Sequence, residues 1–155
     1  MISFRKLEET DFETLFNWLQ QSHVKEWWDD GDDTIEKVRM HYSSDADVVT
    51  RFVLLSDTKH PIGYFQFYIE ASDVIGIDQF IGEVSLINRG LGTNAVKPFV
   101  QLIQDSNQLK TIIVDPETEN HRAIRCYEKA GFRFEKLGIG EDGKQAYFMR
   151  MDTDA

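Results

Sequence analysis

Residues 76–132 constrain the fold most strongly, because they have the pattern of a strand, a glycine turn, a helix, a second strand and a second helix. Residues 75–81 alternate in polarity like a strand, and apolar residues then recur at helical spacing over residues 91–103. Gly90 and Gly92 open this predicted helix. Backbone N–H groups and the helix dipole at such a junction favour an anion, and glycine lets a phosphate approach closely. The pattern therefore predicts an α/β core with a phosphate site.

A second strand and helix follow. Residues 111–114 form a short apolar run typical of a buried strand, and residues 115–132 continue into a helical pattern. Asn120 is a suitable N-cap for this helix, and Gly131 is placed where a helix ends.

These two motifs resemble those of the GNAT family of acetyl-coenzyme A-dependent N-acetyltransferases. In that family a loop of the form (Gln/Arg)-x-x-Gly-x-(Gly/Ala) binds the cofactor's pyrophosphate, and Gly90 and Gly92 match its glycines. A later helix of the form Asn-x-x-Ala-x-x-x-Tyr-x-x-x-Gly-Phe lies beside the thioester. Its matching residues are Asn120, Ala123, Tyr127, Gly131 and Phe132. The loop departs from the family at Ile87, where Arg or Gln is usual, and at Asn88, where a further glycine is common.

The resemblance implies acetyl-coenzyme A as the cofactor and a GNAT-like fold. That fold is α/β, with a mixed, mostly antiparallel sheet, a V-shaped splay between two parallel strands and about four flanking helices. A backbone N–H near Phe80 would polarise the thioester carbonyl, as an oxyanion donor does. The implied cofactor-binding residues are Phe80, Ile81, Arg89, Gly90, Leu91, Gly92, Thr93, Asn120, Arg122, Ala123 and Tyr127.

Two side chains are the candidate catalytic groups. Tyr127 is the candidate general acid, because a phenol of pKa about 10 is protonated at neutral pH and can protonate a departing thiolate. A core tyrosine on the same stripe as Ile124 is the alternative. Asp78 is the candidate general base, since burial in an apolar strand would raise its pKa toward a useful range. A solvent-facing aspartate, or a base acting through water from Glu83, stays open.

The charge of the chain favours a cationic small substrate. The formal net charge is −10, which argues against nucleic acid as a partner and is compatible with steering of a cation. Residues 26–33 carry the densest acidic stretch and two adjacent tryptophans, of which one is expected in the core and the other on a pocket wall. A solvated acidic loop is the alternative. The candidate substrate-binding residues are Trp27, Trp28, Asp29, Asp30, Asp78 and Asp115.

Most of the chain resembles the aminoglycoside 6′-N-acetyltransferase branch of the family. The resemblance rests on residues 23–28, on Gly76-Ile77-Asp78-Gln79 and on residues 122–132. In that branch the aspartate of the Gly-Ile-Asp-Gln segment is the base, which corresponds to Asp78. The link at residues 70–75 is shorter than in well-known members, where a longer acidic loop contributes to the antibiotic site.

Length and composition limit the setting. The 155 residues are expected to form a single N-acetyltransferase domain over 1–155. No apolar run reaches the roughly 20 residues of a membrane helix, and no signal-peptide pattern is present, so we expect a cytoplasmic protein without a membrane partner. The single cysteine, Cys126, suits a reducing compartment and is expected to be structural. The four histidines lack metal-ligand spacing, so no metal is expected. Monomer and homodimer both stay open.

The rest of the chain is expected to contribute strands and helices around the core. Strands are predicted at residues 2–7, 49–55 and 62–69, with a final hairpin of 133–137 and 145–151. A helix carrying Phe12, Leu15, Phe16 and Leu19 is expected to be capped by Thr10 or Asp11, and a second helix with Ile35, Val38 and Tyr42 facing inward by Asp33 or Thr34. Pro98 is expected to kink or end the long helix.

The sequence leaves three hypotheses about function. The first is an aminoglycoside or polyamine acetyltransferase, and the second is a GNAT enzyme for another amine, such as a siderophore hydroxylamine, a small metabolite or a protein N-terminus. The third is a non-catalytic acyl-coenzyme A sensor, which the departures at Ile87 and Asn88 allow.

Overall fold

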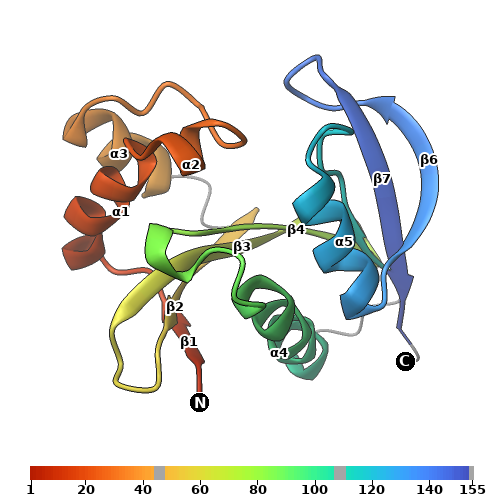
Figure 1. Ribbon diagram of the computed structural model, residues 1–155, viewed down its shortest axis with the longest axis horizontal. Helices are drawn as coiled ribbons and strands as arrows, with labels where there is room; N and C mark the ends of the chain where they lie inside the picture. The colour runs from red at the N-terminus through yellow and green to blue at the C-terminus, as the bar shows by residue number, and fades with distance from the viewer. Residues whose placement is uncertain (44–47, 107–110, 154–155) are drawn as a thin grey trace. The chain divides into compact units, whose positions relative to one another are not determined.

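A computed structural model describes residues 1–43, 48–106 and 111–153 (Figure 1). The chain divides into two compact units. The first unit comprises Met1–Tyr68 and Asp78–Asn88, and the second comprises Ile69–Ile77 and Arg89–Ala155.

The first unit is built from helices on strands. Its elements are β1 (Ser3–Lys6), a 3-10 turn (Glu9–Asp11), α1 (Phe12–Leu19), α2 (Ser22–Lys25), α3 (Ile35–Tyr42), β2 (Val49–Leu55), most of β3 (Pro61–Ala71), the end of β4 (Val74–Ile81) and a second 3-10 turn (Val84–Leu86). The helix α1 packs against α2 and α3. The side chains of α1 that lie in the core are Phe12, Leu15, Trp18 and Leu19.

The second unit contains the long helix and the final hairpin. Its elements are α4 (Leu91–Ser106), β5 (Thr111–Val114), α5 (His121–Ala130), β6 (Arg133–Ile139) and β7 (Gln145–Asp152). The helices α4 and α5 pack against each other, and β6 pairs with β7 along the edge of the sheet (Figure 1).

The seven strands form one mixed sheet in the order β1-β2-β3-β4-β5-β7-β6. The pairs β1–β2, β2–β3, β5–β7 and β6–β7 are antiparallel, whereas β4 and β5 are parallel. The parallel ladder pairs Val74–Gly76 with Thr111–Ile113, and β4 then continues to Ile81. The predicted mixed, mostly antiparallel α/β fold with one parallel pair is confirmed, and the single-turn helix α2 is among the elements that the sequence analysis did not predict.

Capping explains where several helices begin and end. Thr34 accepts a hydrogen bond from the Lys37 amide at 3.2 Å and so caps α3, as predicted. Thr10 or Asp11 was predicted to cap α1, and Asp11 stands at the N-cap position without a side-chain cap bond. Its carboxylate instead accepts from both Arg5 guanidinium nitrogens, at 2.7 and 2.8 Å, and from the Glu8 amide at 2.8 Å. A bidentate charged pair is stronger than a neutral cap bond, so it determines the orientation of this buried carboxylate.

Pro98 lies inside α4, which runs without a break from Leu91 to Ser106. The alternative that the proline ends the helix is therefore wrong, and a kink at Pro98 stays a prediction. Buried residues stand on both sides of it, Ala95 and Val96 before and Phe99 and Val100 after. Burial of this apolar stripe compensates for the hydrogen bond that a proline removes.

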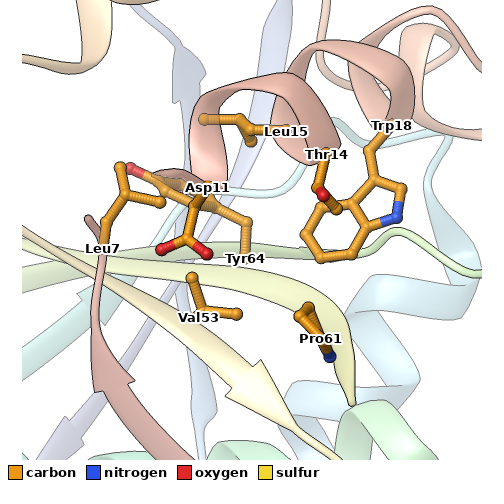
Figure 2. A pocket seen from close by; sticks show the side chains of 8 residues that line it. All are labelled: Leu7, Asp11, Thr14, Leu15, Trp18, Val53, Pro61 and Tyr64. Carbon is orange, nitrogen blue, oxygen red and sulfur yellow. The ribbon is translucent and has the colours of Figure 1, made fainter. Parts of the chain in front are cut away.

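Close packing fills the space below α1. Figure 2 shows Leu15 and Trp18 of α1 facing Val53 of β2 and Pro61 of β3, around a hollow too narrow to hold even a water molecule. Tyr64 lines the same hollow and is fully buried. Within the described residues, no helix combines the length and apolar character needed to cross a bilayer.

Candidate active site

Asp78 lies on the part of β4 that belongs to the first unit and is half-buried. Its Oδ2 accepts a hydrogen bond from Nε2 of Gln66 on β3 at 3.1 Å. The carboxylate is thus held by a neighbouring strand, so the alternative of a purely solvent-facing aspartate does not describe it.

An aromatic cluster in the first unit includes Phe80, which follows Asp78 by two residues on β4. The Trp28 ring meets Phe80 at 5.1 Å and Tyr64 at 5.8 Å, both edge to face. Its indole N–H donates to the Tyr42 hydroxyl at 3.1 Å. Trp28 therefore packs against the core, as expected of one of the two tryptophans, and Trp27 is half-buried beside it.

The carboxylates of the acidic segment differ in exposure and in their ion pairs. Asp29 and Asp30 are exposed, as binding a cation requires. Asp33 pairs with Lys37 at 2.7 Å, and Asp32 pairs with His41 at 2.8 Å. One ligand atom each of Asp30, Asp32 and His41 lies within 4.8 Å of the others, a proximity that sequence spacing did not indicate. The absence of a metal stays a prediction.

The backbone of β4 limits which amides can face an acyl group. The Gly82 amide donates to the Ile62 carbonyl of β3 at 2.9 Å, and the Phe80 carbonyl faces Gly63 of β3. Since backbone groups alternate in direction along a strand, the amides of Gln79 and Ile81 face away from β3. The predicted oxyanion donor near Phe80 would then come from one of these two residues.

The glycine loop has the conformation that an anion site needs. Asn88 has φ +66° and Gly90 has φ +74°, both in the left-handed region. Asparagine tolerates this region better than other non-glycine residues, so Asn88 can replace the glycine common in the family. The helix α4 begins at Leu91, and its first turn carries no acidic residue. The first amides of the helix have no partner within it and carry its positive dipole end, which fits a pyrophosphate.

The start of α4 lies against α5. A Cβ built on Gly92 would lie 3.5 Å from Sγ of Cys126 on α5. Burial raises the pKa of the Cys126 thiol, against the opposing effects of the Thr93 hydroxyl and the Lys129 charge. The thiol therefore stays protonated at neutral pH, in agreement with a structural role.

The helix α5 brings the second motif together. Asn120 accepts from the Ala123 amide at 3.3 Å and caps the helix, and Gly131 ends it with φ +109°. Both features were predicted. Arg122 is exposed in the first turn, and Tyr127 is 6% exposed with its ring 5.5 Å from Phe132.

Asp115 follows β5 in the second unit. Burial and the negative charge of Glu141 raise the pKa of Asp115 to about 6. The charges of Asp142 and Glu70 act in the same direction. A carboxylate with a raised pKa is typical of functional sites but also of turns between acidic residues, so its contact with substrate stays a prediction.

The predicted site residues fall into two groups. The first unit holds Asp78, Phe80, Ile81 and the acidic aromatic segment, and the second holds the glycine loop, α5 and Asp115. A hollow of about 530 Å³ in the first unit, lined by residues of β1, α1, α3 and β2, contains none of the predicted site residues. The side chains that the sequence analysis missed are Gln66 and Tyr64. Gln66 donates to Asp78 directly, and Tyr64 donates to Gln66.

Comparison with known proteins places the chain in a family. A model described as an acetyltransferase (GNAT) domain matches residues 8–138. The chain belongs to the GNAT acetyltransferase family. The resemblance inferred from the two motifs is therefore confirmed.

Relatives within the GNAT family match half of this chain or more. The aminoglycoside N(6′)-acetyltransferase type 1 of Klebsiella pneumoniae is 33% identical over 96% of this chain and 82% of its own. A Rhizobium radiobacter kanamycin resistance protein is 40% identical over 50% of this chain and 71% of its own. A crystal structure of the aminoglycoside acetyltransferase AAC(6′)-Ib with coenzyme A and kanamycin is 34% identical, covers 98% of this chain and 95% of its own, and has a TM-score of 0.91.

Proposed function

We propose that this protein is an acetyl-coenzyme A-dependent N-acetyltransferase that acetylates the 6′-amine of an aminoglycoside antibiotic. The observation that carries the proposal is the 33% identity with an aminoglycoside N(6′)-acetyltransferase over 96% of the chain. The net charge of −10 and the exposed carboxylates of Asp29 and Asp30 support a polycationic acceptor. We propose that residues 1–155 act as one domain in the cytoplasm, as a monomer or homodimer.

In this proposal, the glycine loop and the start of α5 bind the cofactor. Acetyl-coenzyme A supplies the acetyl group as a thioester. The amides of Leu91, Gly92 and Thr93 at the start of α4 bind its pyrophosphate, and the positive charges of Arg89 and Arg122 add to that attraction. The cap residue Asn120 and its partner Ala123 set the start of α5, so they position the acid on that helix. The family motif assigns both residues to cofactor binding.

Asp78 and Tyr127 carry out the two proton transfers. Asp78 takes the proton that the acceptor amine loses as its nitrogen forms the bond to the acyl carbon. Tyr127 gives a proton to the sulfur as the carbon–sulfur bond breaks. The amide of Gln79 or Ile81 stabilises the negative charge that develops on the acyl oxygen. Trp27 and the carboxylates of Asp29 and Asp30 orient the amine.

A second candidate is acetylation of another amine in the same site. The observation that favours it is the two-residue turn Ser72–Asp73 between β3 and β4. In the aminoglycoside branch that the chain resembles, a longer acidic loop at this place contributes to the antibiotic site, and this chain lacks that contribution.

Thiol release in the presence of acetyl-coenzyme A tests the proposal. We expect turnover with kanamycin and no turnover with an aminoglycoside that carries a hydroxyl in place of the 6′-amine. A panel of polyamines, amino-terminal peptides and hydroxylamines serves as comparison. Turnover confined to that panel would favour the second candidate. Acetyl-coenzyme A binding in a thermal-shift assay without turnover on any amine would favour a sensor and contradict both.

A further inference from the structure

A directed chain of hydrogen bonds ends at the carboxylate of Asp78. The Tyr64 hydroxyl donates to Oε1 of Gln66 at 2.6 Å, and Nε2 of Gln66 donates to Oδ2 of Asp78 at 3.1 Å. Tyr64 and Gln66 are two positions apart on β3, so their side chains lie on the same face of the sheet. Tyr64 is fully buried, whereas Gln66 and Asp78 are half-buried. The series of hydrogen bonds therefore runs from the core to the candidate base.

The carboxylate of Asp78 sets the direction of each bond in this series. A carboxylate only accepts hydrogen bonds, so Nε2 of Gln66 donates to Asp78 and Oε1 of Gln66 faces Tyr64. The Tyr64 hydroxyl therefore donates to that oxygen, and the positive charge of Arg51 on β2 acts on the same phenol. The Gln66 amide can satisfy Tyr64 with its oxygen and an ionised Asp78 with its nitrogen in a single orientation. The reverse orientation would set the amide oxygen against the carboxylate.

The Tyr64 phenol is a rigid anchor for this chain. Its ring stacks on Phe80 at 5.6 Å and meets Tyr42 and Trp28 edge to face at 5.4 and 5.8 Å. Burial raises the pKa of Tyr64 well above its ordinary value, against the opposing charge of Arg51. The phenol therefore keeps its proton across the working pH range. Among described side chains, the charged and titratable groups acting on it include Arg51, Tyr42 and Asp78.

We propose that Gln66 is a positioning residue for the catalytic base Asp78, and that Tyr64 acts through Gln66. The inference rests on the proposed function, because it takes Asp78 as the base. Gln66 holds one carboxylate oxygen in a fixed direction toward β3, which limits how the carboxylate can rotate. It also donates to the charged form, and a donated hydrogen bond favours ionisation. Asp78 is thereby held in one orientation before the amine arrives.

Kinetics of Gln66→Met test the positioning role, because methionine has a similar length and donates no hydrogen bond. We expect kcat to fall about tenfold, KM for acetyl-coenzyme A to stay unchanged, and the acidic limb of the kcat/KM profile to move up by about one pH unit. Tyr64→Phe should lower kcat and raise the acidic limb of the kcat/KM profile in the same way, but by less. In an Asp78→Asn background, Gln66→Met should cause no further loss of kcat, since the two residues act as a unit.

Gln101→Met is the matched control. Gln101 lies on an exposed part of α4 and donates to Oδ1 of Asp105 at 2.8 Å. The same substitution there also removes an amide-to-carboxylate bond, and it should change neither kcat nor the pH profile. An equal effect of both substitutions would overturn the positioning role.

A carboxyl-carbon NMR titration of Asp78 needs no turnover. The Asp78 signal is assigned by its loss in Asp78→Asn, and its midpoint is compared between the wild type and Gln66→Met in the unliganded protein. We expect a higher midpoint in the variant, with Tyr64→Phe in between. If Gln66→Met does not fold, Tyr64→Phe provides the comparison. An unchanged midpoint in every folded variant would overturn the inference.

The two proposals fail in different ways. If the wild-type protein acetylates no amine while the NMR midpoint moves, the proposed function is contradicted. The positioning role then fails with it, because there is no catalytic base to position, and the hydrogen bonds have a structural role only. If Asp78→Asn is inactive but Gln66→Met keeps the wild-type kcat and pH profile, the function stands and the positioning role alone is overturned.

Discussion

The Trp18 indole lies directly over Gly82. A Cβ built on Gly82 would lie 2.2 Å from Cδ2 of Trp18, far inside contact distance. The indole nitrogen also donates to Oε1 of Glu83 at 3.3 Å. Glycine at this position thus lets the end of β4 approach α1. The Trp18 contacts hold Gly82 and Glu83, which follow β4.

Gly82→Ala should lower the free energy of unfolding by about 1–3 kcal/mol, because the methyl group forces the buried indole out of its place. Urea unfolding measures the change. The cost should shrink in a Trp18→Leu background, where the side chain no longer covers Gly82. An equal cost in both backgrounds would show that the clash is not its cause.

Gly90→Ala should raise KM for acetyl-coenzyme A, because the loop needs a left-handed residue there, at φ +74°. Gly143 in the turn between β6 and β7 is the matched control, with φ +80° and open space around it. Both substitutions should cost about 1 kcal/mol of stability, measured by thermal unfolding. If Gly143→Ala raises KM as much as Gly90→Ala, the loop does not bind the cofactor.

Tyr127→Phe should lower kcat by about 10²-fold, the usual contribution of a general acid, and leave KM for the amine nearly unchanged. Steady-state kinetics with thiol detection measure both constants. Tyr147→Phe is the matched control, since Tyr147 lies on β7 against Phe134 and outside the proposed site. Wild-type kcat in Tyr127→Phe would remove this residue from the chemistry.

Asp115→Asn should stabilise the protein at pH 8 and have little effect at pH 4. The pKa of Asp115 is raised to about 6 in the folded state from an ordinary value of 3.8. As the pH rises between these values, the unfolded chain releases the proton while the folded protein retains it. The free energy of unfolding therefore falls over this window, and the loss is complete above pH 6.

Melting temperatures at the two pH values check this prediction. Asp57→Asn, in an exposed turn, is the control. A stabilisation by Asp115→Asn that is equal at pH 4 and pH 8 would contradict the raised pKa.

Local sequence signals predicted much of the second unit. The run of β5 at residues 111–114 has the bounds that its apolar pattern indicates, and α5 begins after Asn120 and ends at Gly131 as its capping residues predict. These features depend on neighbours within one helical turn, so a single sequence contains them. The same holds for Thr34 at the start of α3.

Contacts between distant residues were beyond local signals. Alternation along residues 62–69 predicts that Tyr64 and Gln66 share a face, but it does not reveal which residue of β4 lies opposite them. The turn Ser72–Asp73 joins β3 to β4, and Gln66 of β3 donates to Asp78 of β4 across these two strands. Likewise, nothing near Asp11 in the sequence indicates that Arg5 will bind its carboxylate.

The central claim is transfer of an acetyl group to the 6′-amine of an aminoglycoside. The most direct measurement is NMR of the product formed from kanamycin and acetyl-coenzyme A by the wild-type protein, with Asp78→Asn as the inactive comparison. We predict a single acetyl group on the 6′-nitrogen and less than a hundredth of that product with Asp78→Asn, a loss of about 10²-fold or more. Acetylation at another nitrogen, or no acetylated product from the wild type, would contradict the claim.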